Sequence, residues 1–140
     1  MKKILTILIL LIIVLAVLLT IWNKNRNKQQ GIIIQQNETK TIFSLNEIRK
    51  LEKHAFTTNR GDNYSGYLLS DILKSEQITE FKYLILQAND GGSLRLNTQD
   101  IPNAYLILMD EVKEPALRLV ISTDEFGQRW MKYVKTIEVH

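Results

Sequence analysis

The feature that most constrains this chain is a continuous apolar run near its start. Residues 4–22 read ILTILILLIIVLAVLLTIW, and 17 of these 19 residues are apolar. A helix of this length is about 28 Å long, close to the roughly 30 Å hydrocarbon core of a bilayer. The run therefore predicts one membrane-spanning helix within residues 1–22, which leaves residues 31–140 to build a folded domain.

The end of the run bears on whether the segment is an anchor or a cleaved signal peptide. Signal peptides have an apolar region of about 7 to 15 residues and an A-x-A-like cleavage site. This run is longer, and Leu18 to Trp22 contains no pair of small residues. Trp22 suits the membrane interface. We expect an uncleaved signal-anchor, with a cleaved signal peptide as the alternative.

Basic residues flank the apolar run on both sides and bear on its orientation. They are Lys2, Lys3, Lys24, Arg26 and Lys28. The positive charges on the two sides are nearly equal in number, so the positive-inside rule hardly favours either orientation. A very short basic N-terminus, however, usually stays in the cytoplasm. We therefore expect a single-pass protein of the cell membrane with its domain outside. Residues 23–30 (NKNRNKQQ) have no core-forming side chain and are expected to be a polar tether.

Composition excludes several classes of function. Residues 31–140 carry 13 basic and 15 acidic residues, so the pI near 9.1 comes from the membrane flanks. No basic patch with interleaved aromatics occurs, which argues against nucleic acid as a partner. The chain has no cysteine, so disulfides and thiolate chemistry are excluded. The two histidines, His54 and His140, cannot make a zinc site unaided, so a metal is not expected.

Residues 31–140 predict one strand-rich α+β domain with a mixed sheet and two or three short helices. Ser44 and Glu47 have capping-box spacing, and Leu68 to Leu73 predicts a second helical turn. The turn Asn89-Asp90-Gly91-Gly92 predicts a β-hairpin. The expected strands are 32–34, 41–43, 54–58, 81–88, 93–97, 105–109, 116–122 and 134–139.

Two pairs of adjacent acidic residues are candidates for acid–base catalysis. Asp110-Glu111 and Asp124-Glu125 both fall in predicted turns, so solvated loop carboxylates are favoured. No GxSxG, Walker, HExxH or GxGxxG motif occurs. We predict no catalytic residue.

Four segments of the second half form an ordered set. They read YSGYLLSDIL (64–73), QANDG (87–91), PALRLV (115–120) and FGQRWMKYV (126–134), the last leading into IEV. They resemble the YTGvpLrdlL, S-x-DGY, PlRLvvP and YGxKSxKWvxxIeV segments of the sulfite-oxidase-like, molybdopterin-dependent oxidoreductase domain. The resemblance spans about 75 residues and implies a sulfite-oxidase-like, molybdopterin-binding-type fold for residues 31–140.

The chain differs from that family at the residue that binds molybdenum. Its enzymes bind molybdenum through a cysteine in a segment like CaGNRR, whereas the comparable stretch here, residues 56–61, reads FTTNRG. Thr57 or Thr58 near the cysteine's place cannot supply a soft sulfur ligand. The resemblance therefore implies a molybdopterin-like or related pterin, or a small anion, bound without the standard molybdenum ligand.

The resemblance also implies a cofactor-binding site. In the family the GxKSxKW segment wraps the pterin and its phosphate. Here Gly127 would allow close backbone approach, while Arg129 and Lys132 would supply positive charge. The full set of implied site residues is Asn59, Arg60, Arg118, Gly127, Arg129 and Lys132.

A plainer interpretation of the same residues stays open. Arg129 and Lys132 could be solvated surface charges, and Arg118 could pair with a carboxylate such as Glu138. Trp130, which stands where the family has Ser, could fill the pocket instead of lining it.

Three functions follow from the resemblance. The first is a non-catalytic binding module for a pterin or small anion. The second is an oxidoreductase subunit that holds molybdopterin without a protein thiolate. The third is a scaffold that contacts a membrane or redox protein partner.

Overall fold

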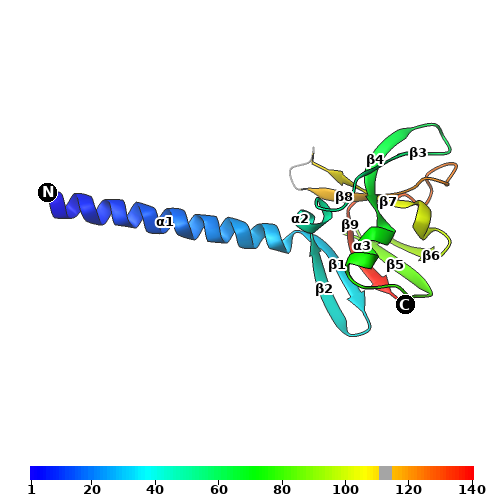
Figure 1. Cartoon of the computed structure of the whole chain (residues 1–140), viewed down its shortest axis with the longest axis horizontal. Helices are drawn as coiled ribbons and strands as arrows, with labels where there is room; N and C mark the ends of the chain where they lie inside the picture. The colour runs from blue at the N-terminus through cyan, green and yellow to red at the C-terminus, as the bar shows by residue number, and fades with distance from the viewer. Residues whose placement is uncertain (111–114) are drawn as a thin grey trace.

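The computed structural model describes residues 1–110 and 115–140, without the side chains of Lys2 and residues 26–29. A long helix leads directly into a domain of two β-sheets (Figure 1). The α+β class, the apolar N-terminal helix and the mixed sheet expected from the sequence are confirmed.

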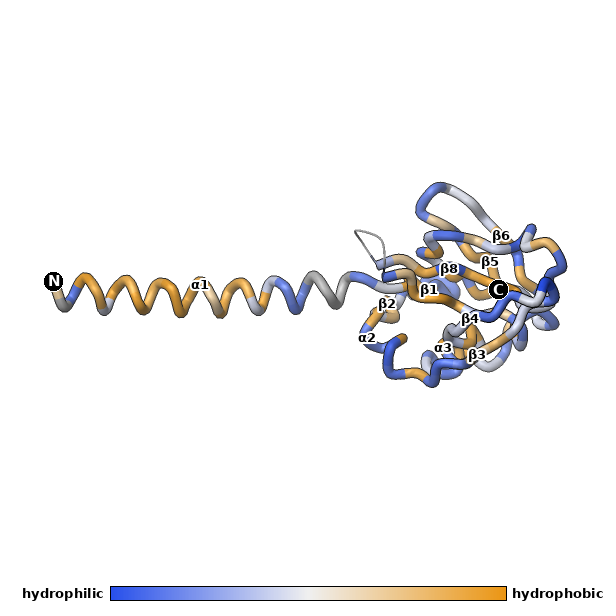
Figure 2. The backbone as a smooth tube through the Cα atoms, turned by 90° about the horizontal axis from the view of Figure 1, so that it is seen from above, coloured by the Kyte–Doolittle hydropathy of each residue, from blue (hydrophilic) through white to orange (hydrophobic). Residues whose placement is uncertain are grey.

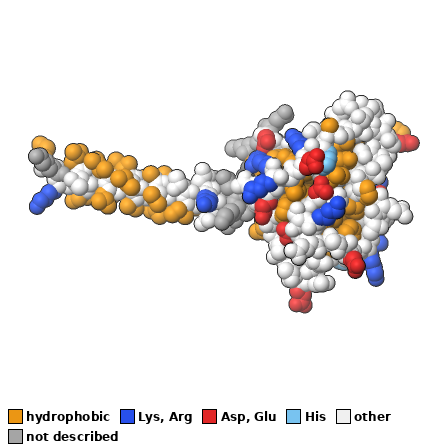
Figure 3. All heavy atoms as spheres, in the orientation of Figure 1, with side chains coloured by type: hydrophobic (Ala, Val, Ile, Leu, Met, Phe, Trp, Pro, Cys, Tyr) orange, Lys and Arg blue, Asp and Glu red, His pale blue; other side chains and the backbone are white. Residues whose placement is uncertain are grey.

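The N-terminal helix, α1, runs from Lys2 to Gln29. Within its stretch Lys3–Asn25, an 18-residue window has a mean hydropathy of 3.5, and none of that window is buried inside the protein. Within the described chain it is the one helix long and apolar enough to cross a membrane. Apolar side chains cover α1 on the visible face, with basic groups near both ends (Figure 3). A helix that is apolar all round suits lipid.

The helix does not stop where the apolar run stops. It continues through the polar segment to Gln29, and β1 begins at Gly31. Residues 23–29, expected to be a polar tether, therefore continue the helix. The apolar stretch of α1 is orange in Figure 2, and hydrophilic residues follow it before the domain. Adding a residue to an existing helix is far easier than starting one, and this segment has neither Pro nor Gly.

Two sheets form the domain. The mixed sheet has the order β2-β1-β9-β5-β6, and β1 pairs antiparallel with β2 but parallel with β9. Its strands are β1 (Gly31–Gln36), β2 (Thr39–Ser44), β5 (Tyr83–Ala88), β6 (Ser93–Asn97) and β9 (Val134–Val139). The second sheet is antiparallel with the order β3-β4-β7-β8. Its strands are β3 (His54–Thr57), β4 (Asn63–Leu68), β7 (Ala104–Met109) and β8 (Ala116–Ile121).

Short helices close the ends of the sheets. They are α2 (Leu45–Ile48), α3 (Leu69–Ser75) and the single 3-10 turn η1 (Ile101–Asn103). The capping box before α2 is confirmed: the Glu47 N–H donates to Ser44 Oγ, and the Ser44 N–H donates to Glu47 Oε2. Hydrogen bonds from the hydroxyl and the backbone N–H of Ser44 hold the pKa of Glu47 below its ordinary value.

One apolar core joins both sheets and both short α-helices. Its fully buried members include Ile32, Ile72, Leu86, Leu106 and Leu119. Because side chains alternate along a strand, the neighbours of these core residues point to the outer faces of the sheets. Arg118 thereby reaches the outer face of the four-stranded sheet.

Strand β4 was missed by the sequence analysis, which took Asn63 as turn and Leu68 as the start of a helix. Gly66 in its middle lowers strand propensity. The structure needs this glycine, because a Cβ there would lie 2.9 Å from the carbonyl oxygen of Leu106 on β7. The close approach of β4 to β7 at this glycine, and not local strand propensity, therefore determines that residues 63–68 form a strand.

The first prediction concerns Gly31, where α1 meets the sheet. A Cβ there would clash with the carbonyl oxygen of Phe43 and lie 2.7 Å from Ser44 Cα. Gly31→Ala should lower the free energy of unfolding by about 1–3 kcal/mol, because backbone must shift to admit the methyl group. Denaturant unfolding of the full chain in detergent measures this.

Gly92→Ala is the matched control, since the nearest atom there, at 3.2 Å, belongs to the flexible side chain of Asp90. A Gly31→Ala variant as stable as Gly92→Ala would contradict the tight junction.

Candidate aromatic and cationic site

Four aromatic rings gather in one run of contacts, and we call them the aromatic face. The rings of Phe56 and Tyr105 stack with centroids 3.9 Å apart and planes at 12°. Phe56 also meets Tyr64 at 5.9 Å, and Tyr64 meets Trp130 edge-on at 6.0 Å. Strands β3, β4 and β7 supply three rings, and the loop before β9 supplies Trp130. All four side chains are half-buried.

Trp130 is fixed in place from two sides. Its Nε1 donates a hydrogen bond to the carbonyl oxygen of Ile121 at 3.1 Å. Gly127 lies against its ring, where a Cβ would come 3.0 Å from Trp130 Cδ2, and Gly127 has a φ of 65°. Glycine at 127 thus admits the indole ring, a different contact from the ligand approach that the resemblance implied.

Arg118 extends this aromatic face with a charge. Its Cζ lies 5.3 Å from the centre of the Trp130 ring, within cation–π range. Its Nε is buried and has no hydrogen-bond acceptor in the described part of the chain. No ion pair among residues 1–110 and 115–140 includes Arg118.

The alternative pairing of Arg118 with Glu138 is wrong. Glu138 accepts a hydrogen bond from Gln87 Nε2 at 2.7 Å and lies 3.5 Å from His140 Nε2. Strand β9, which carries Glu138, belongs to the other sheet. The side chains of Arg118 and Glu138 therefore lie on different sheets and do not pair.

Arg129 is partly exposed, but it is not available as a free charge. Its Nη2 lies 2.6 Å from Asp124 Oδ1, its Nε donates to Asp124 Oδ2 at 3.2 Å, and its Nη1 lies 2.9 Å from Asp100 Oδ1. The hydrogen bond to Asp124 is the main cause that raises the pKa of Arg129 above its ordinary value. Two carboxylates thus neutralise this guanidinium, which ties the loop before β9 to the segment before η1.

The two acidic pairs noted in the sequence have different environments in the structure. Asp124 is an ion-pair partner of Arg129 with a side chain only 9% exposed, which corrects the expectation of a solvated carboxylate. Asp110 pairs with Arg49 at 3.2 Å on the surface. Glu111 lies outside the described residues.

The six implied site residues do not all meet. Arg129 and Lys132 line one hollow of about 380 Å³ together with Asp90 and the aromatic Trp130. Asn59 lies elsewhere: its Nδ2 donates to the carbonyl oxygen of Thr123 at 2.8 Å.

Arg60 sits in an exposed turn with its Nε 3.9 Å from Asp62 Oδ2. Of the implied cations, Arg118 alone combines partial burial with the lack of an acidic partner among the described residues.

The side chains present bear on which ligands this part of the protein could hold. The chain has no cysteine, and the described residues hold no group of three His, Asp or Glu side chains that could bind a metal ion. The protein therefore offers no thiolate to the metal of a molybdopterin. The groups that an organic ligand could meet are the guanidinium of Arg118 and the adjacent rings.

Sequence reasoning named Arg118 but missed the aromatic face. Phe56 and Tyr105 fall in predicted strands, so each could have been assigned to a sheet face. Their contact depends on β3 pairing with β4 and β4 with β7. No local pattern encodes that order.

The second prediction separates Arg129 from Lys132. Arg129→Lys should lower the free energy of unfolding by about 1–2 kcal/mol, because one ammonium cannot replace a fork that binds two carboxylates. Lys132→Ala, at an exposed position, should change it by less than about 0.5 kcal/mol. Denaturant midpoints of the two variants provide the test, and equal small effects would contradict the structural role of Arg129.

Comparison with known proteins does not assign this chain to a family. No model of a protein family matches the chain, and no curated protein matches it. The resemblance to sulfite-oxidase-like domains therefore stays a prediction.

Proposed function

We propose that this protein is a membrane-anchored, extracytoplasmic module that binds an aromatic anion of the pterin class without catalysis. The observation that carries the proposal is Arg118, which lies over the Trp130 ring with a buried Nε that no described acceptor satisfies.

The charge of Arg118 favours an anionic ligand. A buried donor without a partner costs about 1–3 kcal/mol, and more when the group is charged. An anion that reaches the guanidinium would recover this energy through charge-assisted hydrogen bonds. Arg118 remains partly exposed, so a ligand has access to part of the side chain.

The rings favour a planar ligand. Ligand sites typically combine aromatic surface with a few placed polar groups, and flat heterocycles stack on exposed aromatic rings. Phe56, Tyr64 and Tyr105 supply such surface beside the Arg118–Trp130 pair. The resemblance to molybdopterin-dependent domains supports a pterin as the class of heterocycle.

The absence of cysteine supports a role in binding over one in turnover. Redox chemistry in such proteins belongs to the cofactor, and the protein supplies ligation and orientation. This chain offers no thiolate to ligate molybdenum. Its own residues would hold and orient a pterin through Arg118 and the rings.

The third prediction tests the location in the cell membrane. The span of α1 and the basic residues before it support a single pass with the domain outside a bacterial cell. Protease added to intact protoplasts should degrade the domain, as an immunoblot against it would show. Protection of the domain, or a soluble form truncated near Trp22, would contradict the proposed anchoring.

The fourth prediction tests the ligand site. Arg118→Met should weaken binding of a phosphorylated pterin at least tenfold, because charge-assisted hydrogen bonds contribute about 1.5–3 kcal/mol. It should also leave the free energy of unfolding unchanged or raised, since it removes a buried donor without an acceptor. Calorimetric titration and denaturant unfolding of the full chain measure the two effects.

Arg95→Met is the matched control. Arg95 also lies over an aromatic ring, at 3.8 Å from the centre of Tyr83, but on the five-stranded sheet. It should leave pterin binding unchanged. Binding that survives Arg118→Met, or no binding by the native protein, would refute the ligand site and favour the scaffold hypothesis.

A further inference from the structure

The length of α1 beyond its apolar run bears on where the domain would sit. From Trp22 to Gln29, α1 extends about 10 Å beyond the apolar run. The headgroup layer on each side of a bilayer is about 5–8 Å thick. With the apolar run spanning a bilayer, the base of the domain, where β1 begins at Gly31, would lie at the outer edge of that layer.

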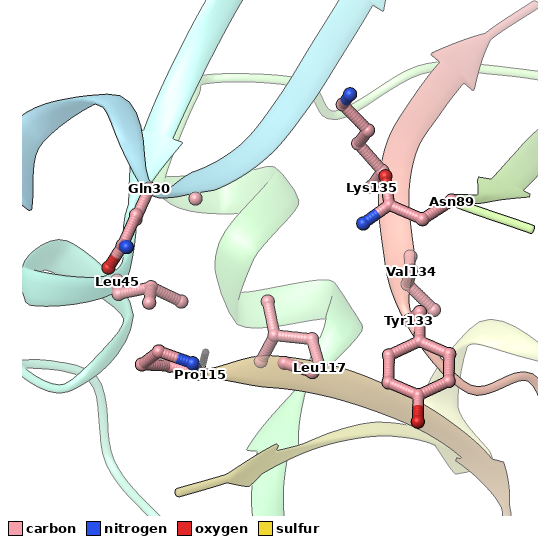
Figure 4. Close-up of a pocket in the computed structure, with 10 residues that line it drawn as sticks. Gln30, Leu45, Asn89, Pro115, Leu117, Tyr133, Val134 and Lys135 are labelled. Carbon is pink, nitrogen blue, oxygen red and sulfur yellow. The ribbon is translucent and has the colours of Figure 1, made fainter. Parts of the chain in front are cut away.

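A hollow of about 170 Å³ lies at this base. Gln30, Leu45 and Pro115 line one side, and Asn89, Tyr133 and Lys135 line the other (Figure 4). Among the residues that the structure describes, those lining the hollow include one cation and no carboxylate. Lys135 has no ion pair with a residue of the described chain.

The backbone at this hollow is strained. Tyr133 has a φ of 59°, a left-handed conformation that costs a residue with a Cβ about 1–2 kcal/mol. The carbonyl oxygen of Tyr133 accepts a hydrogen bond from the Asn89 N–H at 3.0 Å, which joins two residues of the same wall. Strain of this kind concentrates at ligand sites.

We propose that this hollow binds the phosphate headgroup of an anionic membrane lipid. Lys135 supplies the charge, Asn89 supplies an amide donor, and the apolar side chains of Leu45, Pro115 and Leu117 contact the glycerol region. The volume suits a group the size of a phosphoglycerol and is small for a pterin.

The position of the hollow favours a lipid over a soluble phosphate. Its lining begins at Gln30, the residue after the end of α1, so the headgroups of a bilayer that α1 spans would lie close to it. The sequence after the apolar run carries three basic residues before Gln30, a charge that would attract anionic lipids. The inference requires that α1 span a membrane, and it depends neither on the pterin site nor on the side of the membrane.

The test uses the full chain reconstituted in nanodiscs with equal phosphatidylglycerol and phosphatidylcholine. Native mass spectrometry gives the ratio of the two lipids retained by the protein. The native chain should retain mainly phosphatidylglycerol, and Lys135→Ala should lower this preference about fivefold, the effect of one cation near the surface. Lys135→Arg should restore it.

Lys132→Ala is the matched control, because Lys132 is an exposed lysine of the same segment that lines the other hollow. It should leave the lipid preference unchanged. A preference insensitive to Lys135→Ala, or equally sensitive to Lys132→Ala, would overturn the proposal. Displacement of phosphatidylglycerol by millimolar glycerol phosphate would identify a soluble phosphate as the ligand and also overturn it.

Pterin titration of Lys135→Ala distinguishes this site from the first one. Unchanged pterin affinity together with lost lipid preference is the expected result, because the two sites share no residue.

Discussion

Gly31 follows α1 after a single residue and lies in close contact with Phe43 and Ser44 of β2, so the N-terminal helix leads into the sheet without a spacer. The carbonyl oxygen of Gln30 accepts the N–H of Leu45 at 3.0 Å, so the end of α1 is bonded to the start of α2. Gly31 itself opens β1, which pairs with β2 on one side and β9 on the other. The end of α1 is therefore joined directly to the five-stranded sheet, which shares one apolar core with the second sheet.

Arg129 and Arg118 both lie near Trp130, and their different binding partners give them different roles. Arg129 engages two carboxylates, so its charge stabilises the loop that presents the indole ring. Arg118 contacts the ring itself and has no acid among the described residues. The sequence alone does not distinguish these two cations, yet in the structure one binds two carboxylates and the other has no acidic partner among the described residues.

Sequence patterns predicted what depends on local periodicity. The apolar run, the capping box at Ser44 and the hairpin at Asn89 all depend on neighbours within a few residues, and all are present. The continuation of α1 through residues 23–29 was missed because composition was weighed without helix propagation. The aromatic face and the acids around Arg129 join segments far apart in the chain, which one sequence cannot order.

Amide hydrogen exchange across residues 23–29 tests the central claim, that the N-terminal helix continues unbroken up to the domain. The full chain in nanodiscs would be compared with an unstructured peptide of the same sequence. The account predicts exchange much slower than in the peptide, because the helix runs unbroken to Gln29. Exchange at the rate of the peptide would mean a flexible tether and would contradict the account.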